Sequence, residues 1–261
     1  MLFKLRPLSA IYVAAVSLAG ALVIAKAIPG ANNGHPVALA VLMGLSLAAS
    51  VAKIRIPVTG NDSSLTVCHV VDFTTLIVCG PSAAVVVSAF GGWAQCTLRS
   101  PKKNPLHRVV FSVAALAVTM GTAGWVYRWT GGQAGLFTAT PQFEPLISAA
   151  TVVFLMNSIL VAGAGALTTE RSIPLVWFES YLPTWPTYMI GAGLASGIAV
   201  VLERNAYWLL PLLAGPLVLL HRNFIAYLEH VRHSVTDPLT GLPNQRHMVA
   251  HLERQLTQAR D

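Results

Sequence analysis

Charged residues and cysteines are both scarce in this sequence. Lys, Arg, Asp and Glu make up 10% of the 261 residues, whereas hydrophobic residues make up 54%. Soluble domains carry about 25% charged residues, so this composition excludes an ordinary soluble enzyme. The three cysteines, Cys68, Cys79 and Cys96, lie within or beside apolar runs and lack CxxC spacing. We therefore expect reduced core cysteines and no zinc site or disulfide scaffold.

The few charges are unevenly distributed. The first 221 residues contain 18 charged side chains and the last 40 contain nine. The mean hydropathy is +0.62, which indicates that the first 220 residues have the lipid bilayer as their solvent. The net charge of +7 comes from Lys and Arg in short clusters between apolar runs. The positive-inside rule explains this pattern, so no nucleic-acid partner is expected.

Eight membrane passes are predicted from the uncharged runs. Residues 65–98 are too long for one pass and are interrupted by Gly80-Pro81, where the chain is expected to turn between two short antiparallel helices. The fold class is thus an all-α polytopic transmembrane helix bundle, assigned to residues 1–220. The predicted passes are 7–25, 36–52, 65–79, 82–98, 109–127, 146–167, 185–202 and 206–220.

The cationic residues predict the orientation. Eight passes place both termini and the loops 53–64, 99–108 and 168–184 on one side of the membrane. Nine Lys and Arg residues lie on that side, and Lys26, Arg128 and Arg204 lie on the other. We therefore expect the N- and C-termini to be cytoplasmic.

A continuous helix is predicted to leave the membrane. No glycine or proline occurs between Pro216 and Pro238, and apolar residues recur there at alternating three- and four-residue steps. This is the pattern of a coiled coil, so residues 217–236 are interpreted as a signalling helix that forms a homodimer. The alternative is a single amphipathic helix lying on its own domain.

A short motif follows this helix. Residues 236–246 read TDPLTGLPNQR, in which Asp237, Pro238 and Gly241 predict a sharp turn and Asn244 can cap the next helix. The segment resembles the D-x-L-T-G-L-P-N-R-R opening of GGDEF domains, the catalytic modules of bacterial diguanylate cyclases. Residues 237–261 would then be the N-terminal fragment of such a domain.

The resemblance implies a bacterial inner-membrane protein with a nucleotide-signalling output. In the family, the turn joins the signalling helix to the domain and is braced by an Asp and an Arg. These correspond to Asp237 and, one position late, Arg246, because Gln245 occupies the place of the first arginine. The family's GTP and Mg²⁺ sites lie beyond the part that is matched. We therefore expect no catalytic, cofactor or metal residue in this chain, and a diguanylate cyclase as the full-length parent.

Ionisable residues inside apolar runs mark candidate sensing sites. His69 and Asp72 lie three positions apart and would share one helix face beside the Gly80-Pro81 break. Asn157 and Trp93 could complete a pocket for a small molecule, a proton or another stimulus. The structural alternative makes Asp72 the N-cap of a short helix, satisfied by His69.

The membrane part also resembles the multi-pass sensor modules that precede GGDEF domains, through IRIP at 54–57 and GPSAA at 80–84. Three other functions remain open at this stage. The bundle could bind or transport a small solute, the output could be a cyclic di-GMP phosphodiesterase, or the bundle could be a structural anchor.

Overall fold

The chain folds into two compact units, which we describe separately. The computed structural model describes residues 7–31, 36–51, 54–56, 63–65, 68–98, 104–135, 142–169 and 172–209. One unit contains Met1–Lys53 and Thr66–Leu210, and the other contains Ile54–Leu65 and Pro211–Asp261. The predicted signalling helix 217–236 and the GGDEF-like segment 237–261 lie outside the described residues.

The described part of the second unit is a small antiparallel hairpin. Strand β1 (Ile54–Ile56) pairs with β2 (Ser63–Leu65), with Ile54 opposite Leu65. The prediction of a loop at 53–64, followed by a helix from residue 65, is therefore wrong. The sequence Ile-Arg-Ile alternates apolar and charged side chains, as a strand requires, but three residues are too few to stand out among long apolar runs.

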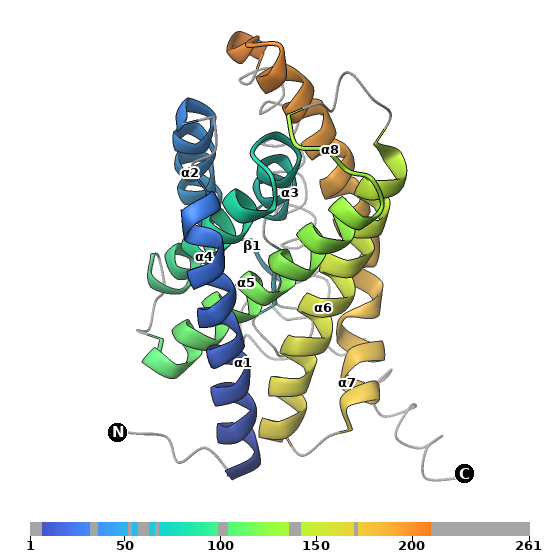
Figure 1. The fold of residues 1–261 in the computed structure, drawn as a ribbon. Coiled ribbons are helices and arrows are strands. Elements are labelled where there is room, and N and C mark those ends of the chain that lie inside the picture. Colours follow the sequence, from blue (N-terminus) through green and yellow to red (C-terminus); the bar gives the residue numbers. More distant parts are fainter. Residues whose placement is uncertain are drawn as a thin grey trace, which may run out of the picture. The chain divides into compact units, whose positions relative to one another are not determined.

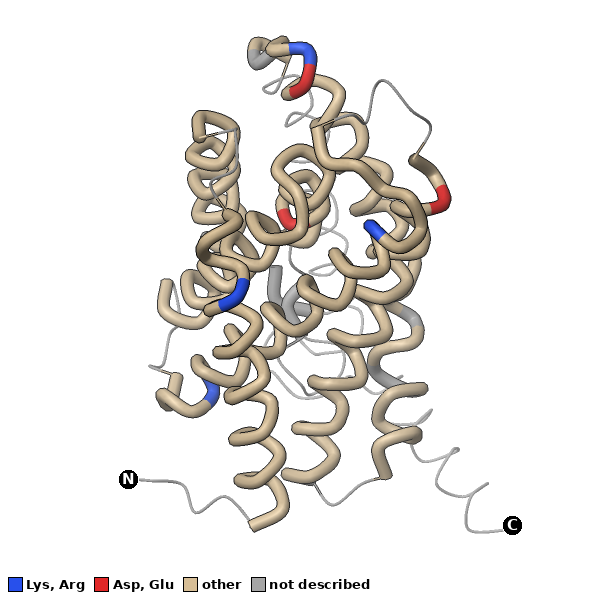
Figure 2. Tube along the Cα trace, viewed as in Figure 1, with Lys and Arg blue, Asp and Glu red and all other residues tan. Residues whose placement is uncertain are grey.

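Four helices of the first unit are long and apolar enough to cross a membrane: α1 (Pro7–Ala27), α5 (Leu106–Trp129), α6 (Phe143–Thr169) and α8 (Trp185–Glu203). Their charged residues lie within the first or last turn, so the colours in Figure 2 gather near helix ends. Those residues are Lys26, Arg108, Arg128, Glu144 and Glu203. This identifies a helical membrane protein with four candidate spans. The described residues do not confirm the predicted count of eight passes.

Three shorter helices lie between α1 and α5 in the chain. They are α2 (Pro36–Val51), α3 (Cys68–Val78) and α4 (Pro81–Thr97), with 16, 11 and 17 residues. At 1.5 Å per residue they are about 16 to 26 Å long, which is short of the 30 Å hydrocarbon layer. The predicted break between the last two is confirmed. Gly80 has φ of 90°, which favours glycine, and Pro81 begins α4.

The region 168–184, predicted to be a loop, contains a further helix. Helix α7 (Ile173–Ser180) is followed by a 3₁₀ turn, η3 (Leu182–Thr184), and then by α8. Pro183 within η3 interrupts what would otherwise be one long helix. Of the predicted last pass, 206–220, the structure describes only the beginning, where η4 (Tyr207–Leu209) makes one turn.

The packing of α5 fixes the direction of its neighbours. Tyr12 of α1 lies beside Phe111, with ring centroids 6.1 Å apart, and Gly20 is pressed against Ala114, so α1 and α5 run parallel. Pro81 of α4 contacts Gly124, near the end of α5, so α4 runs antiparallel to it. Helix α6 also packs against α5 (Figure 1).

Helix α3 is the innermost element of this unit. All of its residues except His69 are buried, and it packs against α8, α4 and α2. Because lipid cannot reach such a helix, its polar side chains must be satisfied by the protein or by a bound molecule.

Candidate functional site

The site is centred on an aspartate inside α3. Asp72 is the fifth of eleven residues in this helix and its side chain is 3% exposed. His69 lies one turn earlier, with Nδ1 3.5 Å from Oδ2 of Asp72 and a side chain that is 21% exposed. This distance permits electrostatic attraction but is too long for a well-formed hydrogen bond. Oδ1 of Asp72 has no hydrogen-bond partner among the described residues.

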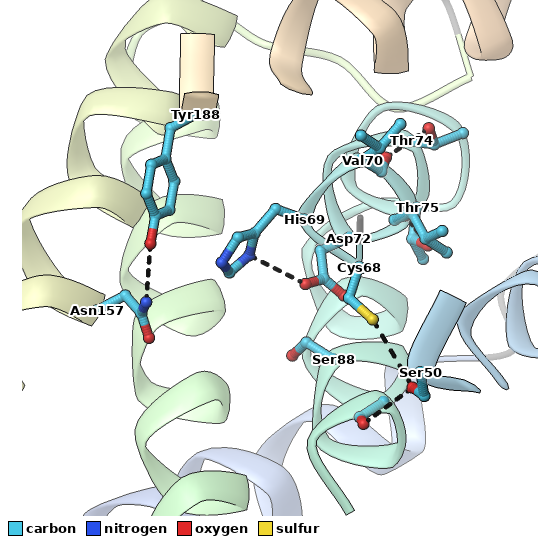
Figure 3. Close-up of polar contacts among 12 residues, drawn as sticks. Ser50, Cys68, His69, Val70, Asp72, Thr74, Thr75, Ser88, Asn157 and Tyr188 are labelled. Carbon is cyan, nitrogen blue, oxygen red and sulfur yellow. Dashed lines mark hydrogen bonds and ion pairs between the residues drawn. The ribbon is translucent and has the colours of Figure 1, made fainter. Parts of the chain in front are cut away.

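Two residues from other helices face His69. The imidazole ring lies against the ring of Tyr188 in α8, with centroids 4.8 Å apart, and Nδ2 of Asn157 in α6 donates a 2.9 Å hydrogen bond to the Tyr188 hydroxyl. Figure 3 shows His69 between this pair and Asp72. Asn157 is the fifteenth of the 27 residues in α6, so the site lies near the middle of that candidate span.

Aromatic rings extend the site towards α7. Phe154 of α6 contacts Tyr188 edge-on, with centroids 5.5 Å apart, and Trp177 of α7 lies 6.0 Å from Phe154. The indole N–H of Trp177 donates a 2.8 Å hydrogen bond to Oγ of Ser158. The rings of His69, Tyr188, Phe154 and Trp177 thus form a continuous series, which we call the aromatic wall.

On its other side, the site borders the junction of α2 with α3. Ser50, in the last turn of α2, has its Oγ 3.7 Å from Sγ of Cys68, the first residue of α3. The same hydroxyl is 2.7 Å from the carbonyl oxygen of Ser46 and 3.3 Å from that of Gly91 in α4. Because Ser50 lies this close to Cys68, the end of α2 and the start of α3 meet inside the protein (Figure 3).

The end of α2 and the starts of α3 and α8 therefore all lie at the site. Helix α3 begins one residue before His69, and α8 begins three residues before Tyr188, directly after the 3₁₀ turn η3. Helix ends carry backbone N–H and C=O groups without intrahelical partners. In membrane proteins such broken helices are tolerated where they are buried in protein or line a binding cavity, and in transporters they mark the substrate site.

No protein-family model, curated protein or solved structure matches this chain. Its chemistry therefore follows from the geometry of the residues themselves.

The structure confirms the shared face of His69 and Asp72 and brings Asn157 to the same site through Tyr188. The alternative in which Asp72 is an N-cap is wrong, because Asp72 lies in the interior of α3. Trp93, on α4, has a side chain that is 47% exposed, and its ring contacts Phe90 of the same helix. The predicted turn residues, Asp237, Pro238, Gly241, Asn244 and Arg246, lie outside the described residues.

Two residues of the site were missed from the sequence. Tyr188 falls within the predicted pass 185–202, although a tyrosine hydroxyl in an apolar run needs a hydrogen-bond partner. Trp177 lies in the region 168–184 that is predicted to be a loop, whereas its indole N–H donates a hydrogen bond to Ser158 on α6. The available signal was the set of polar groups within apolar runs, but their pairing required the three-dimensional arrangement.

The arrangement places one carboxylate where neither lipid nor bulk water solvates it. A buried charge without a hydrogen-bonded partner costs several kcal/mol. The other charged residues of the described helices lie near helix ends. Asp72 can thus hold a proton, or it can accept hydrogen bonds from a bound molecule. Either event weakens the attraction between Asp72 and His69, and His69 in turn contacts Tyr188 of α8.

Proposed function

We propose that this chain is the membrane-embedded sensory module of a bacterial signalling protein. Its output would be a diguanylate cyclase domain, of which residues 237–261 are the beginning. The observation that carries this proposal is the buried Asp72 on a helix that packs against α8. The GGDEF-like motif at 236–246 supports it from the sequence.

The route for a signal runs from α3 to α8. A stimulus at Asp72 alters the position of His69, which lies on the ring of Tyr188 in the first turn of α8. Helix α8 is the last α-helix of the described chain and precedes the proposed signalling helix 217–236. In a homodimer, a shift of this helix would bring two GTP- and Mg²⁺-loaded domains together or apart, and so set cyclic di-GMP synthesis.

The directions of α1 and α5 are compatible with a cytoplasmic N-terminus in the bacterial inner membrane. Helices α1 and α5 run parallel, so their first residues lie at the same face of the bundle. The cations Lys4, Arg6, Lys102 and Lys103 lie in the sequence just before these two helices, whereas Lys26 and Arg128 lie at the opposite ends. The positive-inside rule then assigns the starts of α1 and α5 to the cytoplasm.

The polypeptide produced in native membranes tests the proposed output. We expect an antibody against the N-terminus to detect a chain heavier than 27.7 kDa by roughly the 100 to 200 residues of one domain. A product of 27.7 kDa would contradict a cyclase output and favour solute binding or transport.

Mechanical coupling is tested in the full-length protein by inserting Gly-Gly at Ala226. The insertion weakens a continuous helix, because glycine costs about 1 kcal/mol per residue relative to alanine in a helix interior. We expect cyclic di-GMP levels in cells to become independent of Asp72, so that Asp72→Asn changes the level only in the uninterrupted protein. An Ala-Ala insertion, which preserves the helix but rotates it, is the matched control. Regulation that survives Gly-Gly would contradict the rod mechanism.

The competing functions give different readings in the same strain. A transporter would accumulate solute in vesicles in an Asp72-dependent manner without altering cyclic di-GMP. A phosphodiesterase output would make the signal lower cyclic di-GMP, and an anchor would leave both readings unaffected by Asp72→Asn.

A further inference from the structure

The carboxylate of Asp72 has an unsatisfied oxygen that points to a class of ligand. The residue is 2% exposed, and its Oδ1 has no hydrogen-bond partner among the described residues, while Oδ2 has only the 3.5 Å contact with His69. An unpaired buried acceptor calls for a donor. Lys and Arg do not supply it within the described helices, where they lie near the ends of the spans.

The aromatic wall adds a second recognition element. The ring of His69 lies 4.8 Å from that of Tyr188, and Phe154 and Trp177 continue the series at 5.5 and 6.0 Å. The faces of Tyr, Phe and Trp rings attract organic cations, and the attraction is strongest where water is excluded. A carboxylate next to such rings is suited to an ammonium group with an attached carbon skeleton. The same surroundings repel anions.

We propose that Asp72 and the aromatic wall bind a small organic ammonium ion. Its N–H groups donate to Oδ1 of Asp72, and its carbon skeleton lies against the rings of Tyr188 and Phe154. His69, whose side chain is 21% exposed, lies between the carboxylate and Tyr188 (Figure 3), so the imidazole has to turn aside for one ligand to contact both. This assignment rests on the proposed sensory function and names its ligand class.

Thermal stability of the purified chain in detergent, followed by tryptophan fluorescence, tests the ligand class. The probes are methylammonium, ethanolammonium, benzylammonium and putrescine, as chloride salts. Each is compared with its uncharged alcohol or diol analogue in sodium chloride at equal ionic strength. We expect at least one ammonium ion to raise Tm by several degrees, as a ligand well above its Kd does, while its analogue has no effect. Equal shifts for ions and analogues, or no shift for any ion, would overturn the proposal.

Matched variants locate the binding. Asp72→Asn retains the shape but not the charge, and is expected to abolish the shift. Glu144→Gln makes the same change near the start of α6 and should preserve the shift. If Asp72→Asn does not fold, Tyr188 provides the test. Tyr188→Phe retains the aromatic face and binding, whereas Tyr188→Leu should weaken binding about two- to thirtyfold, the range of a cation–π contact. Equal affinity of Tyr188→Leu and the wild type would overturn the role of the wall.

The ligand assignment and the sensory function can fail separately. An ammonium shift lost in Asp72→Asn, with cyclic di-GMP unaffected by the ligand, would support the site and contradict the proposed output. A response of cyclic di-GMP to pH that requires Asp72, without any ammonium shift, would support the sensor and overturn the ammonium assignment in favour of a proton.

Discussion

The long outer helices and the short inner helix of this protein have opposite surroundings, lipid for the first and protein for the second. Helix α1 exposes Leu8, Leu18 and Leu22, and only four of its 21 residues are buried. Helix α3 has eleven residues, of which His69 alone is not buried. Lipid can cover the apolar residues of α1, whereas the polar side chains of α3 can be satisfied only by protein or by a bound molecule.

This difference shows where function can be placed in a membrane bundle. Polar groups in a lipid-facing helix must stay near its ends, as Lys26 does in α1. A helix enclosed by others can carry a carboxylate in its interior, as α3 carries Asp72. The short length of α3 places a helix start at the level of His69 and Tyr188.

Matched leucines give the largest expected difference between the two regions. Leu76 of α3 is 0% exposed and Leu18 of α1 is 65% exposed. Leu76→Ala should lower the free energy of unfolding by about 2–4 kcal/mol, because the surrounding helices leave a cavity. Leu18→Ala should have little effect, because lipid or detergent fills the space. Denaturation in mixed micelles measures both, and equal losses would show that α3 is not enclosed.

Glycines sharpen the comparison within the outer layer. A Cβ at Gly20 of α1 would lie 2.4 Å from Cα and Cβ of Ala114 on α5, whereas a Cβ at Gly44 of α2 would have nothing within 4 Å. Gly20→Ala forces two backbones apart and should destabilise the protein by about 1–3 kcal/mol. Gly44→Ala should be neutral or stabilise by up to about 1 kcal/mol, because it improves helix propensity. If the two variants had the same melting temperature, the close contact of α1 with α5 would be disproved.

Apolar length and proline position were enough to predict much of the fold. The helix break at Gly80-Pro81 follows from local chemistry, as does the placement of α1, α5, α6 and α8 in long uncharged runs. The hairpin 54–65 and helix α7 were missed because their elements are short. Helix α7 also contains Pro174 in its first turn and is followed by Pro183, in a stretch rich in aromatic residues that resembles a membrane interface.

The sequence predicts the pair within α3 and Asn157 as a further member of the site, but not the side chain that joins them. His69 and Asp72 share a turn of α3, so their spacing implies their contact. The contacts of His69 with Tyr188 and of Tyr188 with Asn157 join three helices that are distant in sequence. Helical periodicity says which face of α8 is apolar, but not which residue of α3 lies against it.

The smallest expected effect concerns the bond that ties α7 to α6. Trp177→Phe retains a ring against Phe154 but removes the 2.8 Å hydrogen bond to Oγ of Ser158. Interhelical hydrogen bonds in membranes average about 0.6 kcal/mol, because the unfolded chain also finds partners there. A double-mutant cycle with Ser158→Ala should therefore give a coupling free energy of about that size, and Trp93→Phe with Ser158→Ala should give none. A coupling of zero for Trp177 would mean that α7 is held by its ring contacts alone. The aromatic wall would then be adjustable at its α7 end and fixed at Tyr188, where the hydroxyl is held by Asn157.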